Sequence, residues 1–273
     1  MNCKICNNPT RFLFNKKVLN KYDAEYFQCE NCGFIQIKNP LWLNEAYKSA
    51  ISSLDTGLVA RNIWYSSFVE KIIIKYFNQN NKFIDYGGGY GLFVRLMRDK
   101  GFDYYRQDNY CQNLFAESFD IQDLNNDNQK FELLTAFELF EHLEEPISEI
   151  EKMLKFSDSI LFSTELQLQN TEDLENWWYF SPESGQHISF YTKESLNFIA
   201  KKFNLNLSTN NKSIHILTKK SFETSPFEKE KTVIHILRKI AKLIFSHLDA
   251  PKKEIKSLTQ EDYEKIKQLK TKL

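Results

Sequence analysis

A glycine-rich segment near residue 90 has the composition of a cofactor-binding turn. A short apolar run ends in Asp85, and three alternate glycines follow, Gly87, Gly89 and Gly91. A strand that ends in such a turn and leads into a helix exposes backbone N–H groups to a ligand. The third glycine of a dinucleotide fingerprint is missing, since Leu92 takes its place, and no Gly-Lys-Ser/Thr sequence indicates a phosphate-binding loop. The segment therefore predicts a nucleotide-type cofactor other than NAD or ATP.

Four cysteines form two pairs near the start of the chain. Cys3 and Cys6 are separated by two residues, and so are Cys29 and Cys32. Two CxxC pairs can supply four thiolates to one tetrahedral zinc ion, although the segment between these pairs is slightly longer than usual. We expect one structural Zn²⁺ here. The alternatives are a set of buried free thiols or a catalytic dithiol, for which the strand-to-helix context is missing.

The order of acid and glycines resembles a known motif. Asp85-x-Gly87-x-Gly89-x-Gly91 is similar to motif I of class I S-adenosylmethionine-dependent methyltransferases. Asp108 follows a second expected strand, where that family carries its ribose-binding acid, and residues 131–143 resemble its fourth strand with the Glu-His-Leu that often follows. The resemblance covers residues 55–220 and implies S-adenosylmethionine as cofactor. The cofactor contacts it implies are Asp85, Gly87, Gly89, Gly91, Asp108, Phe137 and Glu138.

An aromatic segment is the candidate for contacts with the methyl acceptor. Trp177, Trp178 and Tyr179 stand in a long connection, and planar side chains can stack on sugars or bases. The alternative is a hydrophobic cover over the cofactor. With residues 185–192, Gly-Gln-His-Ile-Ser-Phe-Tyr-Thr, the segment resembles methyltransferases of surface-polysaccharide and modified-sugar biosynthesis, some of which carry an N-terminal four-cysteine zinc motif. This resemblance implies a nucleotide sugar or polysaccharide precursor as acceptor.

Two histidines are candidates for a general base. Methyl transfer from a sulfonium is an in-line displacement, and a base is needed when the acceptor is a hydroxyl or an acidic carbon. His187 lies in the expected substrate segment, and His142, with Glu141 beside it, follows the expected fourth strand. The alternative for His187 is a hydrogen-bonded structural histidine that anchors its loop.

The pattern of elements predicts an α/β fold. From residue 83 on, strand-like and helix-like segments alternate, including a short helix at 113–116 and a strand at 119–121, which is typical of a mainly parallel sheet. We expect a Rossmann-like sheet of seven strands with helices on both faces, its last strand antiparallel as in the family. The expected parts are a zinc knuckle at 1–37, a helical lead-in at 38–80, the methyltransferase core at 81–220 and C-terminal helices at 221–273.

The overall composition limits the partners and the location. Lys+Arg and Asp+Glu both number 36, so no excess charge indicates a nucleic-acid partner. No run approaches the ~18 apolar residues of a membrane span, and the first residues lack the apolar core of a signal peptide. We expect a cytoplasmic protein with a small-molecule acceptor. The amphipathic residues 233–245 are expected to dock on the domain or on a second copy, and attachment to a membrane surface is the alternative.

Two other functions are compatible with the sequence. One is a zinc-containing RNA methyltransferase, although the few basic residues of the knuckle are offset by acids. The other is a cofactor-binding scaffold without catalysis that recruits a partner through the knuckle and the C-terminal helices. Transfer of a labelled methyl group to nucleotide sugars, to RNA or to neither separates the three.

Overall fold

The computed structural model describes residues 1–48, 52–124, 130–167, 174–227, 264 and 267–268. The amphipathic segment 233–245 and most of the expected C-terminal extension lie outside these residues. No helix in the described part is long and apolar enough to cross a membrane. The α-helices in it are α1 Leu43–Ala46, α2 Leu58–Tyr76, α3 Leu92–Asp99, α4 Pro146–Phe156 and α5 Lys193–Lys202.

The larger of two sheets carries the glycine-rich turn. Its strand order is β5-β4-β6-β7-β10-β9. β10 is antiparallel to both of its neighbours, β7 and β9, and the other pairs are parallel. The mainly parallel α/β sheet that the sequence predicts is therefore confirmed. Its strands are β4 Lys82–Tyr86, β5 Asp103–Gln107, β6 Leu134–Ala136, β7 Ser159–Ser163, β9 Asn206–Thr209 and β10 Ile214–Thr218.

The seventh strand expected at 119–121 is reduced to a single bridge beside β5. Asp120 bridges Arg106 in parallel orientation, and the chain then turns into the 3₁₀ helix Ile121–Asp123. The Asp120 amide donates to the carboxylate of Asp123 at 2.8 Å, which ends the extended conformation after one residue. The helix expected at 113–116 is also wrong, because the Asn113 side chain accepts from the Ala116 amide and closes a turn instead.

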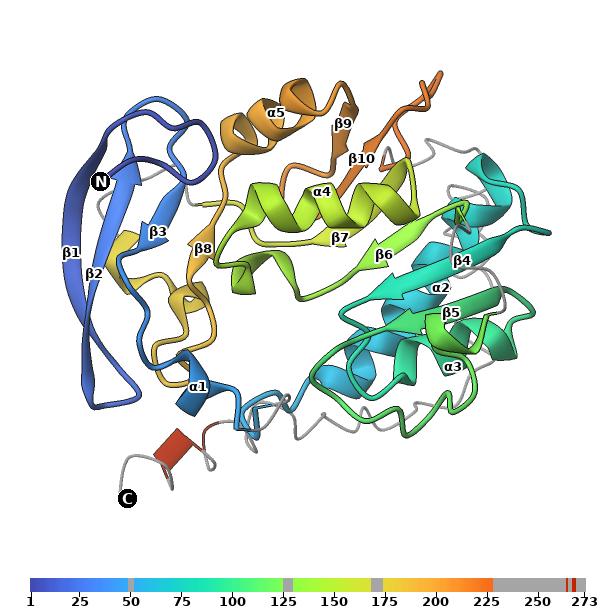
Figure 1. Ribbon diagram of the computed structural model, residues 1–273, viewed down its shortest axis with the longest axis horizontal. Helices are drawn as coiled ribbons and strands as arrows, with labels where there is room; N and C mark the ends of the chain where they lie inside the picture. The colour runs from blue at the N-terminus through green and yellow to red at the C-terminus, as the bar shows by residue number, and fades with distance from the viewer. Residues whose placement is uncertain (49–51, 125–129, 168–173, 228–263, 265–266, 269–273) are drawn as a thin grey trace, which may run out of the picture.

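Helices cover both faces of the larger sheet (Figure 1). Phe83 of β4 belongs to the core beneath α2 and α3, with Val69 among its members. The next strand residue, Ile84, belongs to the core beneath α4 and α5, with Ile150 among its members. Side chains alternate between the faces of a strand, so β4 is buried from both sides. Packing on both faces of β4 therefore fixes the position of the turn that follows Tyr86.

The smaller sheet joins the N-terminal segment to a distant part of the chain. Its order is β1-β2-β3-β8, all antiparallel, and it stands at the left in Figure 1. β8 thus completes the sheet that residues 1–37 begin. The strands are β1 Thr10–Val18, β2 Tyr22–Cys29, β3 Ile35–Ile37 and β8 Ser189–Phe190.

Candidate active site and metal centre

The turn after β4 has a left-handed backbone that favours glycine. Gly87, Gly89 and Gly91 have φ of 71°, 53° and 85°. A Cβ on Gly91 would lie 2.5 Å from the Asn113 side-chain oxygen, and one on Gly87 would lie 3.0 Å from Leu139. Gly91 stands directly before α3, so the turn lies at the carboxyl end of a strand and the start of a helix. This backbone fits the close approach of a cofactor that the sequence predicts.

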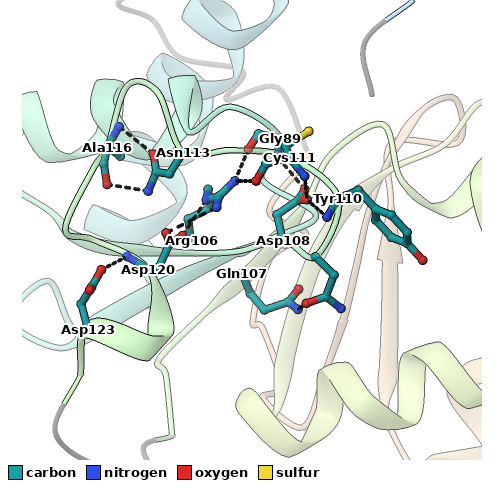
Figure 2. A network of polar contacts seen from close by, with 11 residues as sticks. Gly89, Arg106, Gln107, Asp108, Tyr110, Cys111, Asn113, Ala116, Asp120 and Asp123 are labelled. Carbon is teal, nitrogen blue, oxygen red and sulfur yellow. Dashed lines mark hydrogen bonds and ion pairs between the residues drawn. The ribbon is translucent and has the colours of Figure 1, made fainter. Parts of the chain in front are cut away.

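Asp108 is tied to this turn by hydrogen bonds. One carboxylate oxygen accepts from the Gly89 amide at 2.9 Å, and the other accepts from Tyr110 at 2.7 Å and Cys111 at 2.9 Å (Figure 2). The oxygen that faces Gly89 keeps one lone pair, while the other has both engaged. One acceptor position of Asp108 is therefore left for a ribose hydroxyl, and the ribose contact that the family resemblance implies stays a prediction.

Arg106 of β5 belongs to the same hydrogen-bond network, and the sequence analysis did not predict it as a site residue. Its side chain is 5% exposed, pairs with Asp120 at 2.6 Å and donates to the carbonyl oxygens of Gly89 and Cys111. Figure 2 shows the guanidinium between these groups. An arginine inside a strand, two residues before an acid, is the only sequence signal that pointed to it.

Asp85 is buried rather than open to a ligand. Its carboxylate accepts from the Thr135 hydroxyl at 2.7 Å, and a Cβ on Gly88 would lie 2.9 Å from its other oxygen. Burial raises the pKa of Asp85 to about 7, partly offset by the hydrogen bond from Thr135. Asp85 thus lies between β6 and the turn.

Phe137 and Glu138 connect the end of β6 to α2. Phe137 stacks on Tyr65 with ring centroids 4.1 Å apart. Glu138 has a φ of 52°, and its carboxylate accepts from the hydroxyls of Tyr65 at 2.7 Å and Ser163 at 2.8 Å. Arg61 lies 3.3 Å from its other oxygen. Helix α2 is thereby fixed beside the carboxyl edge of the sheet.

Glu141, His142 and His187 meet just beyond this edge. The ring centroids of the two histidines are 5.0 Å apart, and the Ile188 amide donates to the Glu141 carbonyl at 2.8 Å. Burial raises the pKa of Glu141 well above its usual range, and burial lowers the pKa of His142 to about 3 and also that of His187. The structure brings the three predicted catalytic side chains together, with both histidines neutral near pH 7.

The aromatic segment divides into buried and exposed members. Trp177 and Tyr179 are 6% and 4% exposed and pack with Phe180 and Phe190 in the core below the smaller sheet. Trp178 is 71% exposed. Trp177 and Tyr179 are thus core residues of the smaller sheet, and contact of the aromatic segment with an acceptor stays a prediction.

The four paired cysteines converge on one point. Their sulfur atoms all lie within 4.8 Å of one another, with 3.6 Å between Cys3 and Cys32 and 3.3 Å between Cys6 and Cys29. Tetrahedral Zn–S bonds of about 2.3 Å separate the sulfurs by about 3.8 Å, so the cluster fits a zinc ion after a small expansion. The amide of Cys32 also points to the sulfur of Cys29 at 3.4 Å.

The cysteine cluster is attached to the segments that carry the two histidines. Lys4 donates to the carbonyl of Glu144 at 2.7 Å and pairs with Glu145 at 3.1 Å. On the other side, the Thr192 hydroxyl donates to the Cys32 carbonyl at 2.6 Å. The cluster therefore supports both the segment after His142 and the start of α5.

A family model identifies the domain. The family model described as "Methyltransferase domain" matches residues 63–210, more than half of the chain. Comparison with curated protein sequences gives no match. Among solved structures, TnmH is 13% identical with a TM-score of 0.45, over 66% of this chain and 62% of its own.

Two further structures show the same range of similarity. An O-methyltransferase family 2 protein from Planctomyces limnophilus DSM 3776, in complex with apigenin, is 11% identical with a TM-score of 0.43, over 66% of this chain and 65% of its own. CalO1, a methyltransferase in calicheamicin biosynthesis in its SAH-bound form, is 12% identical with a TM-score of 0.39. The match covers 56% of this chain and 54% of CalO1. The chain thus spans less than two thirds of each of these three proteins. By the family match, it belongs to the methyltransferase-domain family and carries a class I S-adenosylmethionine-dependent methyltransferase domain.

Proposed function

We propose that this chain methylates an oxygen or carbon atom of a small, sugar-linked acceptor such as a nucleotide sugar or a polysaccharide precursor. The observation that carries the proposal is the cluster of Glu141, His142 and His187 at the same sheet edge as the glycine turn. The acceptor class rests on the sequence resemblance of residues 177–192 to sugar-modifying methyltransferases. Bound S-adenosylmethionine supplies an electrophilic methyl group on its sulfonium.

The residues of the chain then have separate tasks. The turn at Gly87–Gly91 and Asp108 hold the cofactor, and α2 covers the site beside Glu138. His187 is the proposed base. Its Nδ1 donates to the Tyr179 carbonyl at 2.6 Å, so Nε2 is free to take the acceptor's proton. His142 is the second candidate. Holding donor and acceptor in line supplies much of the remaining rate.

The rest of the molecule has a supporting role in this proposal. A structural Zn²⁺ at the four paired cysteines stabilises residues 1–37 and the segments attached to them. The division into a knuckle at 1–37, a lead-in at 38–80, a core at 81–220 and an extension at 221–273 is part of the proposal. Reduced thiols of this kind fit the cytoplasm.

Labelled S-adenosylmethionine tests the proposal directly. The protein is incubated with a panel of nucleotide sugars and, separately, with bulk RNA. Label on a nucleotide sugar supports the proposal, and His187→Gln should then lower turnover by about 10²–10⁴-fold. Label on RNA instead identifies an RNA methyltransferase and contradicts the proposal. Label on neither, with the cofactor bound, indicates a scaffold and contradicts it as well.

A further inference from the structure

The cluster of Glu141, His142 and His187 has the atoms of a cation site. One carboxylate oxygen and one nitrogen of each ring lie within 4.8 Å of one another. Two backbone contacts hold the segments together, from the Ile188 amide to the Glu141 carbonyl at 2.8 Å and from the Ser189 hydroxyl to the Leu143 carbonyl at 2.6 Å. The three side chains are thus brought together by paired segments rather than by one loop.

The two histidines are oriented by backbone carbonyls. Nδ1 of His187 lies 2.6 Å from the Tyr179 carbonyl, and Nδ1 of His142 lies 3.0 Å from the Gln186 carbonyl. A carbonyl only accepts, so it assigns the proton to Nδ1 in both rings, and the Tyr47 hydroxyl, 3.0 Å from Nδ1 of His142, is then a second acceptor. The lone pair of each ring is then at Nε2. Metal-binding histidines are oriented in this way by the partner of their other nitrogen.

Glu141 has no normal partner inside the fold. The residue is 0% exposed, and neither carboxylate oxygen has a hydrogen bond of normal geometry among the described residues, although the Tyr179 hydroxyl lies near. A buried carboxylate without a partner is strongly unfavourable. The nearby acid Glu138 differs, because Tyr65, Ser163 and Arg61 already occupy its oxygens. Of these two acids, Glu141 is the one with oxygens left to bind a cation.

We propose that Glu141, His142 and His187 bind one divalent cation of the first transition row. One carboxylate and two imidazoles suit Mn²⁺, Fe²⁺, Co²⁺ or Zn²⁺ better than Mg²⁺ or Ca²⁺, which prefer all-oxygen sites. Bonds of about 2.0–2.2 Å need the donors about 3–4 Å apart, which side-chain movements of about 1 Å provide.

The proposed site is open on one side. Both histidines are only half-buried, in contrast to Glu141, and three protein ligands leave coordination positions free. We assign those positions to oxygen atoms of the methyl acceptor. With the cation bound, Nε2 of His187 is a ligand rather than the base, and the cation itself lowers the pKa of the acceptor hydroxyl. This last step rests on the proposed function, whereas binding of the cation does not.

Titration of the full chain with Mn²⁺ tests the site, with the cysteine centre loaded with zinc beforehand. Free Mn²⁺ is followed by electron paramagnetic resonance. Wild type should bind one Mn²⁺ per chain. Glu141→Gln and His187→Gln should each lower the affinity for Mn²⁺ by about 10–100-fold. Glu144→Gln, an exposed acid three residues away, should bind like wild type. Zinc content and S-adenosylhomocysteine affinity show whether each variant has folded.

Two results overturn the proposal. One is that wild type binds no Mn²⁺ up to about 1 mM. The other is that a folded Glu141→Gln or His187→Gln variant binds Mn²⁺ as tightly as wild type. Neither result touches methyl transfer, so the proposed function would stand. Conversely, bound Mn²⁺ without label on any nucleotide sugar would reject the proposed function and leave the cation site in place.

Discussion

The carboxylate of Asp108 accepts a hydrogen bond from the Gly89 amide at 2.9 Å, so the acid after β5 is joined to the glycine turn after β4. Arg106 reinforces this link, because its guanidinium donates to the carbonyl oxygens of Gly89 and Cys111. The acid expected to bind the cofactor is therefore also part of the turn itself. Substitutions at Asp108 should change the shape of the turn together with cofactor affinity.

Replacing Asp108 should weaken cofactor binding at least tenfold. Asp108→Ala removes the carboxylate that accepts from three backbone amides and from the expected ribose hydroxyl. Each of these hydrogen bonds is charge-assisted, a kind worth about 1.5–3 kcal/mol. Calorimetric titration with S-adenosylhomocysteine measures the loss. Asp99→Asn, at the exposed end of α3, is the control and should bind normally. Equal affinities for Asp108→Ala and wild type would reject the role of Asp108.

The cysteine cluster should carry one zinc ion per chain. Cys29→Ser should lose the metal and lower thermal stability, because a structural zinc site contributes to folding directly. Activity should fall too, since Lys4 and Thr192 attach the cluster to the segments of both histidines. Cys111→Ser is the matched control, a free cysteine outside the cluster. Metal analysis that finds no zinc in wild type, or equal zinc in Cys29→Ser, would contradict the site.

The charge of Asp85 should make stability depend on pH. Burial raises its pKa from 3.8 to about 7, so the folded chain retains a proton that the unfolded chain loses above about pH 4. The stabilisation of the folded state by the protonated Asp85 carboxyl is complete below about pH 4 and is lost as pH rises through about 7. Asp85→Asn stays neutral and should gain stability relative to wild type across this window, by about 4 kcal/mol at most. A difference in unfolding free energy that stays constant from pH 4 to 8 would refute this.

Two adjacent tryptophans should respond in opposite ways to truncation. Trp177 is 6% exposed, so Trp177→Ala should cost about 3–5 kcal/mol of folding stability. Trp178 is 71% exposed, and Trp178→Ala should keep stability while raising the acceptor's KM. Thermal unfolding and kinetics with a nucleotide sugar measure both. If Trp178→Ala leaves KM unchanged, the exposed ring has no part in acceptor binding.

The features predictable from the sequence are those set by neighbouring residues. Gly87, Gly89 and Gly91 adopt left-handed conformations, and the spacing of the paired cysteines matches their clustering. The single bridge at Asp120 was not predictable, because it depends on Arg106 and on a cap within the turn.

Features that depend on distant residues were missed. β8 pairs with β3, where Phe190 faces Ile35, although a two-residue strand gives no periodic signal. The unpaired burial of Glu141 follows from this pairing, since it places the segment of Ile188 over the end of β6. Sequence patterns report local geometry, and these contacts depend on the packing of segments far apart in the chain.

The most direct test of the central claim is calorimetric titration of S-adenosylhomocysteine into wild type and two glycine variants. Gly91 and Gly101 have φ of 85° and 89°, but a Cβ on Gly91 would lie 2.5 Å from Asn113, whereas one on Gly101 meets nothing within 4 Å. We expect one binding site in wild type, retained in Gly101→Ala and at least tenfold weaker in Gly91→Ala. Absence of binding to wild type, or equal affinity in Gly91→Ala, would contradict a cofactor site at the glycine turn.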